Sequence, residues 1–139
     1  MITHHASLVI STSGTGTYEI TDRVAAELRR SGVRNGIVTV FCRHTSCSLV
    51  IFENADPSAR ADLEAWFERL VPAGDRLFTH TAEGADDMPA HLKMALTRTS
   101  ETIPVADTRL LLGEWQGIFL WEHRAVAHRR SVVVTVMGE

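Results

Sequence analysis

Residues 41–54, FCRHTSCSLVIFEN, set the arrangement that we expect for the central strands of this chain. Two runs rich in β-forming residues, 36–42 and 48–53, meet at a short polar turn, and we expect them to pair across it. The turn carries His44 beside the hydroxyl-bearing residues Thr45 and Ser46. A histidine in this setting indicates either a wall of a polar site or a hairpin turn whose imidazole is satisfied by hydroxyls.

Outward from this turn, short strands alternate with helical segments. Helices are predicted from Thr21 to a stop at Gly32, from Pro57 to a stop at 72–74, and from Met88 onward. Further strands are predicted at 6–12, 17–20, 101–105, 108–112, 117–122 and 131–137. We expect the first two of these strands to form an opening hairpin. The last is apolar on both faces, which is typical of a central strand or of one buried at a subunit contact.

The size and charge of the chain exclude several classes of protein. Its 139 residues are 45% hydrophobic with a net charge of −3, which is typical of one α+β globular domain and gives no reason to expect nucleic acid or membrane as a partner. No apolar run reaches the roughly 20 residues that cross a bilayer, and no secretory signal is recognised. Cys42 and Cys47 are interpreted as reduced thiols, so a cytoplasmic location is expected. His4 and His5 are interpreted as a polar start, with a tag remnant or a metal-binding end as the alternatives.

A carboxylate and a histidine four residues apart form the second candidate site. Asp87 and His91 share one face of the predicted third helix, where the carboxylate can orient the imidazole or both can bind a metal. His80, Glu83 and Asp86 precede them in a loop that contains glycine. The alternative is that an aspartate only caps the helix while His91 packs at the edge of the core.

A third candidate lies on the strand predicted at 117–122. Side chains alternate along a strand, so Gln116, Glu122 and Arg124 share one side and offer an amide, a carboxylate and a guanidinium fork. The alternative is a core strand whose polar ends meet solvent. The chain has no dinucleotide-binding glycine motif, Walker A sequence, HExxH or GxSxG elbow. A nucleophilic pair of His44 with Cys42 or Cys47 is possible, but no pattern indicates an activated thiol.

Ordered motifs over nearly the whole chain point to one family. They are His44-Thr45-Ser46, residues 53–57 (ENADP), 87–93 (DMPAHLK), 112–118 (LGEWQGI) and 122–124 (EHR). In this order they resemble the YjbQ family of small proteins, known as secondary thiamine-phosphate synthases. One departure is Glu114, where we expect a small residue or threonine, and it affects local charge rather than the fold.

The resemblance implies one YjbQ-like domain over 1–139, with a mainly antiparallel sheet, helices packed on it and assembly as a homotrimer. It implies a transferase that joins hydroxymethylpyrimidine diphosphate to thiazole phosphate, either as its main activity or as a secondary one. The implied catalytic residues are His44, Asp87, His91 and Glu122. The implied substrate-binding residues are Thr45, Ser46, Asn54, Trp115, Gln116 and Arg124, with Ser46 and Arg124 expected to hold phosphate oxygens.

A divalent metal ion, magnesium or zinc, is expected as cofactor, with His44, His91 and Asp87 as candidate ligands. Histidines suit zinc better than magnesium, and this preference keeps two other functions open. One is a metal-dependent hydrolase of a small phosphorylated or acylated metabolite. The other is a non-catalytic trimeric binding protein for a small anion.

Overall fold

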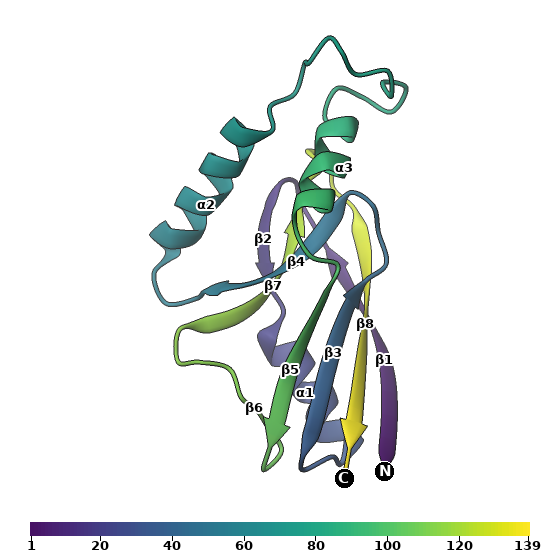
Figure 1. Ribbon diagram of the computed structural model, residues 1–139, viewed down its shortest axis with the longest axis vertical. Helices are drawn as coiled ribbons and strands as arrows, with labels where there is room; N and C mark the ends of the chain where they lie inside the picture. The colour runs from purple at the N-terminus through teal and green to yellow at the C-terminus, as the bar shows by residue number, and fades with distance from the viewer.

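The computed structural model describes residues 1–139 as two antiparallel sheets with three helices packed around them (Figure 1). The larger sheet has the order β1 (Ile2–Ser11), β8 (Arg129–Gly138), β3 (Gly36–Cys42), β5 (Ser100–Ala106), β6 (Arg109–Leu110). The smaller sheet has the order β2 (Gly16–Glu19), β7 (Gln116–Glu122), β4 (Cys47–Glu53). The helices are α1 (Thr21–Ser31), α2 (Pro57–Leu70) and α3 (Asp87–Leu96). The α+β class and the mainly antiparallel sheet are therefore confirmed.

Local signals placed the helices well. α1 ends where Gly32 adopts the left-handed conformation at φ 75°, which glycine reaches without steric cost. α2 begins behind Asp56, whose side chain accepts a hydrogen bond from the Ser58 N–H, with Pro57 in the first helical position. The final strand, β8, lies between β1 and β3, which is the first of the two placements expected for it.

The two predicted hairpins are wrong. β3 pairs with β8 and β5, whereas β4 pairs with β7, so the turn at residues 43–46 carries the chain from one sheet into the other. β1 and β2 are likewise divided, because β1 pairs with β8 and β2 with β7. An alternating pattern identifies a strand but carries no information about its partner when the competing partners are distant in sequence. The turn that holds His44 is therefore a corner between sheets.

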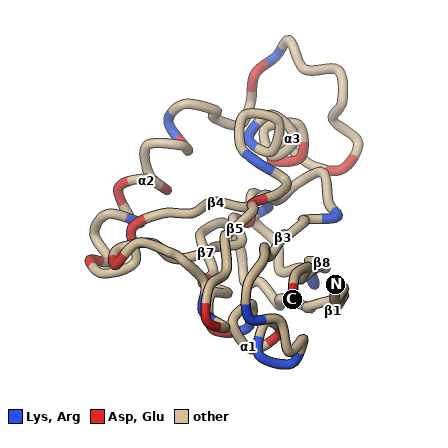
Figure 2. The backbone as a smooth tube through the Cα atoms, turned by 60° about the horizontal axis from the view of Figure 1, so that its bottom comes forward, with Lys and Arg blue, Asp and Glu red and all other residues tan.

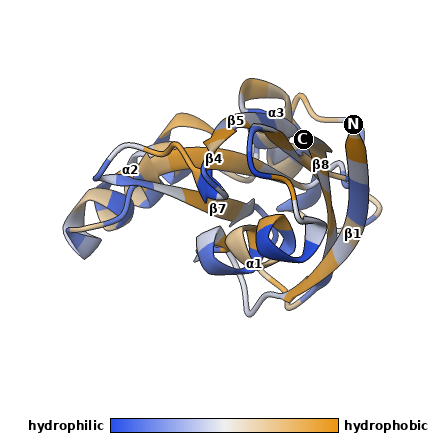
Figure 3. Cartoon of the chain, turned by 90° about the horizontal axis from the view of Figure 1, so that it is seen from below, coloured by the Kyte–Doolittle hydropathy of each residue, from blue (hydrophilic) through white to orange (hydrophobic).

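The core lies between the inner face of the larger sheet, the smaller sheet and α1. β4 and the middle of β7 are hydrophobic in Figure 3, and Ile118, Phe119 and Leu120 of β7 are fully buried, so this strand packs against apolar side chains on both of its faces. The outer face of the larger sheet carries no helix (Figure 1). On this outer face, Val9, Ile37, Phe41 and Met137 are between 41% and 47% exposed.

α2 and α3 lie together at one end of the molecule, joined by a long irregular segment, residues 71–86 (Figure 1). The apolar residues of α2 are only partly buried, since Phe67 is 4% exposed while Trp66 is 51% and Leu70 is 52% exposed. Basic and acidic positions are interspersed along the backbone, with both signs on α1 and on α3 (Figure 2). No helix has the length and apolar character needed to cross a membrane.

Candidate metal centre

Two histidines converge on one buried carboxylate at the start of α3. Asp87 is 1% exposed, and its Oδ2 lies 2.8 Å from His80 Nε2 and 3.1 Å from His91 Nε2. One ligand atom from each of the three residues lies within 4.8 Å of the other two. The helical turn places His91 above Asp87, and the preceding loop brings His80 to the same oxygen. The cluster remains partly open, because His80 is half exposed and His91 lies at the surface edge.

The corner between the sheets fixes the orientation of His91. His91 Nδ1 lies 2.6 Å from the carbonyl oxygen of Thr45, and a carbonyl only accepts, so Nδ1 carries a proton. In the neutral imidazole, Nε2 then holds a lone pair and cannot donate to Asp87. Its approach to Asp87 Oδ2 is favourable only when the ring is doubly protonated or a cation lies between the two atoms. A backbone carbonyl that holds the remote nitrogen is the arrangement found around metal-binding histidines.

Arg124 balances the charge of the cluster and is fully engaged there. Its Nη1 donates to Asp87 Oδ1 at 2.8 Å, its Nε to Asp86 Oδ2 at 3.2 Å and its Nη2 to the Glu83 carbonyl at 2.9 Å. Burial opposes ionisation of Asp87, but the hydrogen bond from His80 and the charges of His91 and Arg124 outweigh it and hold the pKa of this carboxyl below its usual value. Each nitrogen of the guanidinium already donates to a protein oxygen, so no pair of N–H groups remains for a bidentate bond to phosphate, the role that was expected of Arg124.

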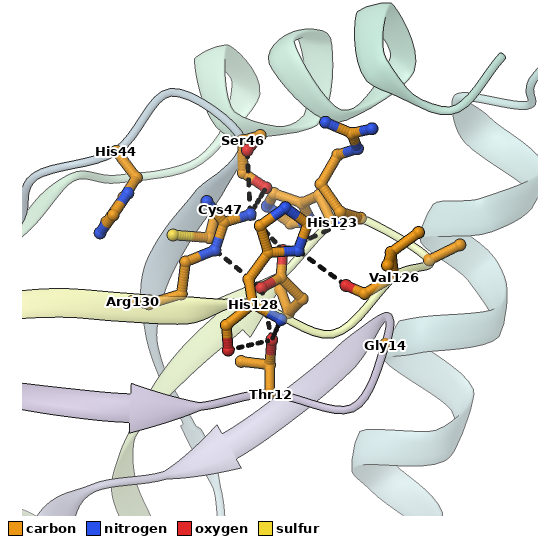
Figure 4. A network of polar contacts seen from close by, with 12 residues as sticks. Thr12, Gly14, His44, Ser46, Cys47, His123, Val126, His128 and Arg130 are labelled. Atoms are coloured by element: carbon orange, nitrogen blue, oxygen red, sulfur yellow. Dashed lines mark hydrogen bonds and ion pairs between the residues drawn. The ribbon is translucent and has the colours of Figure 1, made fainter. Parts of the chain in front are cut away.

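Ser46 and Arg130 belong to a second, buried polar network (Figure 4), which also includes Glu122. Glu122 is 0% exposed and accepts hydrogen bonds from Arg130 Nε at 2.7 Å and Thr12 Oγ1 at 2.8 Å. Ser46 Oγ accepts from Arg130 Nη2 at 2.9 Å. Burial opposes ionisation of Glu122, but the bond from Arg130 leads the contacts that lower its pKa. The structure thus separates the Glu122 carboxylate and the Ser46 hydroxyl from the cluster and uses both to join β7, β8 and the corner.

His44 lies apart from both groups, and Figure 4 shows its ring turned away from the Arg130 network. Its Nε2 accepts a hydrogen bond from the Ser131 N–H at 2.7 Å. Burial, followed by the charge of Arg130, lowers the pKa of His44. The structure therefore does not bring His44 to Asp87 and His91, and the third side chain beside this pair is His80. The corner reaches the cluster through the Thr45 carbonyl and not through the neighbouring imidazole.

The remaining predicted residues gather at the other end of β7. Trp115 is 58% exposed, the Gln116 side chain accepts from the Gly113 N–H at 2.8 Å, and Asn54 donates to the Gln116 carbonyl at 3.4 Å. The six residue steps from Gln116 to Glu122 span about 20 Å of strand. Within one chain, the structure therefore divides the predicted site into the cluster at Asp87, the network at Glu122, the separate His44 and the group at the far end of β7.

His80 is the cluster residue absent from the predicted ligand set. The sequence did carry a signal, since His80 stands seven residues before Asp87 in a loop crowded with Glu83 and Asp86. An irregular loop has no periodicity, however, and its side-chain directions cannot be read from spacing. Arg130, the partner of Glu122, was also missed because it is hidden at the start of a valine-rich strand.

These features define a class of protein: a small α+β protein with a candidate His–Asp–His metal centre where a helix meets the corner between two sheets. The family model described as "UPF0047 protein YjbQ-like" matches residues 6–139, and the chain belongs to this family. A UPF0047 protein of Synechocystis sp. is 52% identical over 98% of this chain and 92% of its own length. The YjbQ protein of Escherichia coli O157:H7 is 38% identical over 98% of this chain and 99% of its own length.

A solved structure from Clostridium acetobutylicum, described as an uncharacterized conserved protein of the YjbQ/UPF0047 family, shares the fold. It aligns with a TM-score of 0.87 at 33% identity, covering 95% of this chain and 99% of the other. A protein from Sulfolobus solfataricus, with a TM-score of 0.85 and 25% identity over 99% of both chains, is described as a YbjQ-like protein of unknown function.

The prediction of thiamine-phosphate synthase activity is wrong, because membership of this family does not support it. The family that matches is described only as UPF0047 and YjbQ-like, and the relatives named above carry no transferase activity in their descriptions. The geometry agrees, because Arg124, which was expected to hold a phosphate oxygen, is bound to Asp87, and Ser46, which was expected to hold another, is buried beside Arg130.

Proposed function

We propose that this chain binds a divalent transition-metal ion through His80, Asp87 and His91 and hydrolyses a small, uncharged acylated compound there. The observation that carries the proposal is the approach of both Nε2 atoms to one oxygen of Asp87, with His91 Nδ1 held by the Thr45 carbonyl. Two imidazoles and one carboxylate are a ligand set of hydrolytic zinc sites, and they leave coordination positions open. When bound, such an ion would supply Lewis acidity and lower the pKa of a coordinated water.

The protein groups prepare the site in three ways. Thr45 keeps the lone pair of His91 directed at the cluster. Arg124 adds to the effect of His80 and His91 in lowering the pKa of Asp87, which favours the ionised form that a ligand must have. The half-exposed side of His80 leaves a path for a substrate carbonyl. These are positioning and charge-setting roles, and they need no further titratable group from the Glu122 network.

The charge around the cluster favours a neutral substrate over a phosphorylated one. A cavity of about 240 Å³ adjoins His80, and no lysine or arginine lines it; its lining residues are Gly74, Asp75, Phe78, His80, Thr81, Gly84, Ala85 and Met88. Asp75 and Phe78 also line a second cavity of about 320 Å³, whose other walls are Leu70, Val71, Pro72, Leu92, Ala95 and Leu96. An apolar acyl group suits this second cavity, whereas neither cavity offers a lysine or an arginine to a phosphate.

Metal binding is tested on purified, metal-stripped protein titrated with zinc. We expect one tightly held ion per chain, and we expect His80→Ala and His91→Ala each to weaken binding by at least about 100-fold, because each removes a ligand from a three-residue set. His5→Ala is the matched control, since His5 is exposed on β1 and its ring hydrogen-bonds to Thr135 of the larger sheet. Wild-type affinity in both cluster variants would contradict the proposed centre.

Activity is tested with matched panels of p-nitrophenyl acyl esters and p-nitrophenyl phosphate, before and after zinc is restored. We expect ester hydrolysis that depends on the ion and is abolished in His91→Ala. Phosphate-ester turnover alone would overturn the inference about substrate charge. Stoichiometric metal without turnover of either panel would leave a metal-binding protein and overturn the hydrolase.

A further inference from the structure

We propose that Cys42 and Cys47 form an oxidisable dithiol, a modification site at which hydroperoxides close an intramolecular disulfide across the corner between the sheets. The two sulfur atoms lie 3.3 Å apart, and a disulfide requires about 2.05 Å, so the sulfurs must approach each other by a little over about 1 Å. The thiols end β3 and begin β4, and they are the only cysteines in the chain. This proposal stands independently of the metal centre.

Burial limits the alternatives open to these thiols. Cys42 is 2% exposed and Cys47 is 0% exposed, so a second protein chain cannot reach either sulfur. A cavity of about 460 Å³, lined by Phe41, Cys42, Arg43, His44, Thr45, Met94 and Thr99, does reach Cys42. A small oxidant can therefore meet Cys42 first, with Cys47 as the one thiol placed to respond.

The surroundings of Cys42 suit it to the attacking role. The hydrogen bond from Cys47 and, against burial, the bond from the His44 backbone and the charge of Arg130 lower the pKa of the Cys42 thiol. The pKa of the Cys47 thiol is raised, first by its hydrogen bond with Cys42 and then by burial. The thiolate is the reactive form of cysteine, so this asymmetry favours attack by Cys42.

The reaction balances in two steps. The Cys42 sulfur attacks a peroxide oxygen, the O–O bond breaks, and Cys42 becomes a sulfenic acid while one oxygen leaves as water. The Cys47 thiol then loses its proton, and its sulfur attacks the Cys42 sulfur. An S–S bond forms, the S–O bond breaks and a second water leaves. Two thiols are thereby oxidised by two electrons, and one hydrogen peroxide is reduced to two waters.

The ring closed by this bond encloses the residues that support both polar networks. Thr45, within the ring, holds His91 through its carbonyl, and Ser46 accepts from Arg130. The disulfide therefore ties the corner at the point where the larger sheet, the smaller sheet and α3 meet. A disulfide stabilises the fold by restricting the unfolded chain, and a short ring limits this gain. We therefore expect the oxidised protein to melt only roughly 5 °C higher than the reduced protein.

Arg43 makes the test direct, because trypsin separates the two cysteines into residues 35–43 and residues 44–60. Reduced, folded wild-type protein is treated with hydrogen peroxide, denatured, alkylated and digested. We expect mass spectrometry to find the two peptides linked, in most of the protein, and separated again by dithiothreitol. Recovery of both peptides as free alkylated thiols, or with Cys42 as sulfinic acid and Cys47 unmodified, would overturn the proposal.

Two variants assign the order of attack. In Cys47→Ala we expect Cys42 to stop at the sulfenic acid, which dimedone traps, whereas Cys42→Ala should leave Cys47 unmodified. Reaction of Cys47 in the absence of Cys42 would overturn the assigned order. The peptide linkage in wild-type protein tests the disulfide itself, whether or not either variant folds.

Discussion

At the scale of single residues, Asp87 is a buried charge that depends on its partners. Its carboxylate receives His80 and His91 on one oxygen and Arg124 on the other. A buried ion is tolerated only when it is paired and hydrogen-bonded, and removal of one partner leaves the opposite charge uncompensated. The same residue therefore serves stability and the proposed metal site, and its substitution should affect both.

Asp87→Asn should lower the free energy of unfolding of the metal-free protein by up to about 3–5 kcal/mol, because Arg124 loses its more buried carboxylate partner and keeps only Asp86. Urea unfolding measures the change. Asp107→Asn is the matched control, since the Asp107 side chain is 67% exposed and faces Arg34 across the surface, and such pairs contribute at most about 1 kcal/mol. Equal effects of the two substitutions would contradict the account given for Asp87.

His123 gives the protein a predictable dependence on pH. Burial is the main cause that lowers its pKa to about 3, and its Nε2 lies 2.8 Å from Ser48 Oγ. The unfolded state binds this proton below the ordinary histidine pKa of about 6.5, whereas the folded state does not. Stability should therefore fall as pH drops from 6.5 toward 3, by up to about 1.4 kcal/mol per pH unit.

His44 adds to this slope in the same direction, because burial lowers its pKa as well. His123→Gln keeps a polar partner for Ser48 and removes the titration, so it should flatten the unfolding free energy between pH 6 and pH 5. At lower pH, Glu122 and Asp87 contribute as well, because the pKa of each is lower in the folded state than in the unfolded state. Each carboxylate stabilises the fold at a pH above the ordinary carboxyl pKa, and this stabilisation is lost as the pH falls through the folded-state pKa. A wild-type slope in His123→Gln would assign the pH dependence to another group.

At the scale of elements, the sequence predicted what is local and missed what is distant. The helix ends were predictable because Asp56 and Gly32 act on their own neighbourhood. The partner of β3 was not, because β8 lies about 90 residues away along the chain and a turn of four residues looks like a hairpin in either case. The spacing along α3 predicted that Asp87 lies beside His91. The side-chain direction of His80 was not predictable, because this residue lies in an irregular loop that has no repeating geometry.

Asp86 joins the start of α3 to the end of β7 and should act as a positioning residue. Its Oδ2 accepts from Arg124 Nε at 3.2 Å and from the Ala125 N–H at 2.8 Å. Asp86→Ala should weaken zinc binding by about 10-fold, because Arg124 and hence Asp87 lose their orientation, although no ligand is removed. Asp86→Asn retains an acceptor for Ala125 and should recover part of the affinity. Equal affinity in wild type and Asp86→Ala would show that this link does not set the geometry.

At the scale of the whole molecule, one sheet face lacks a cover. α1 and the smaller sheet cover the inner face of the larger sheet, while the outer face presents Ile37 beside Met137 and Phe41 beside Val133 in register. Single exposed apolar residues are ordinary, but several aligned on one flat face are typical of a contact surface. The homotrimer implied by the family resemblance stays a prediction, and this face is where we propose that copies of the chain meet.

The assembly prediction can be tested with one pair of variants. Three chains of 15.4 kDa give a particle of about 46 kDa, which light scattering on a sizing column distinguishes from a monomer. Phe41→Glu should shift the particle toward 15.4 kDa, because it places a charge in the apolar contact while its side chain, 47% exposed in the single chain, leaves the fold intact. Leu77→Glu is the matched control, since Leu77 is 87% exposed in the segment that joins α2 to α3, away from this face. A wild-type monomer at micromolar concentration would contradict the trimer. A trimer that persists in Phe41→Glu would show that the contact lies on another face.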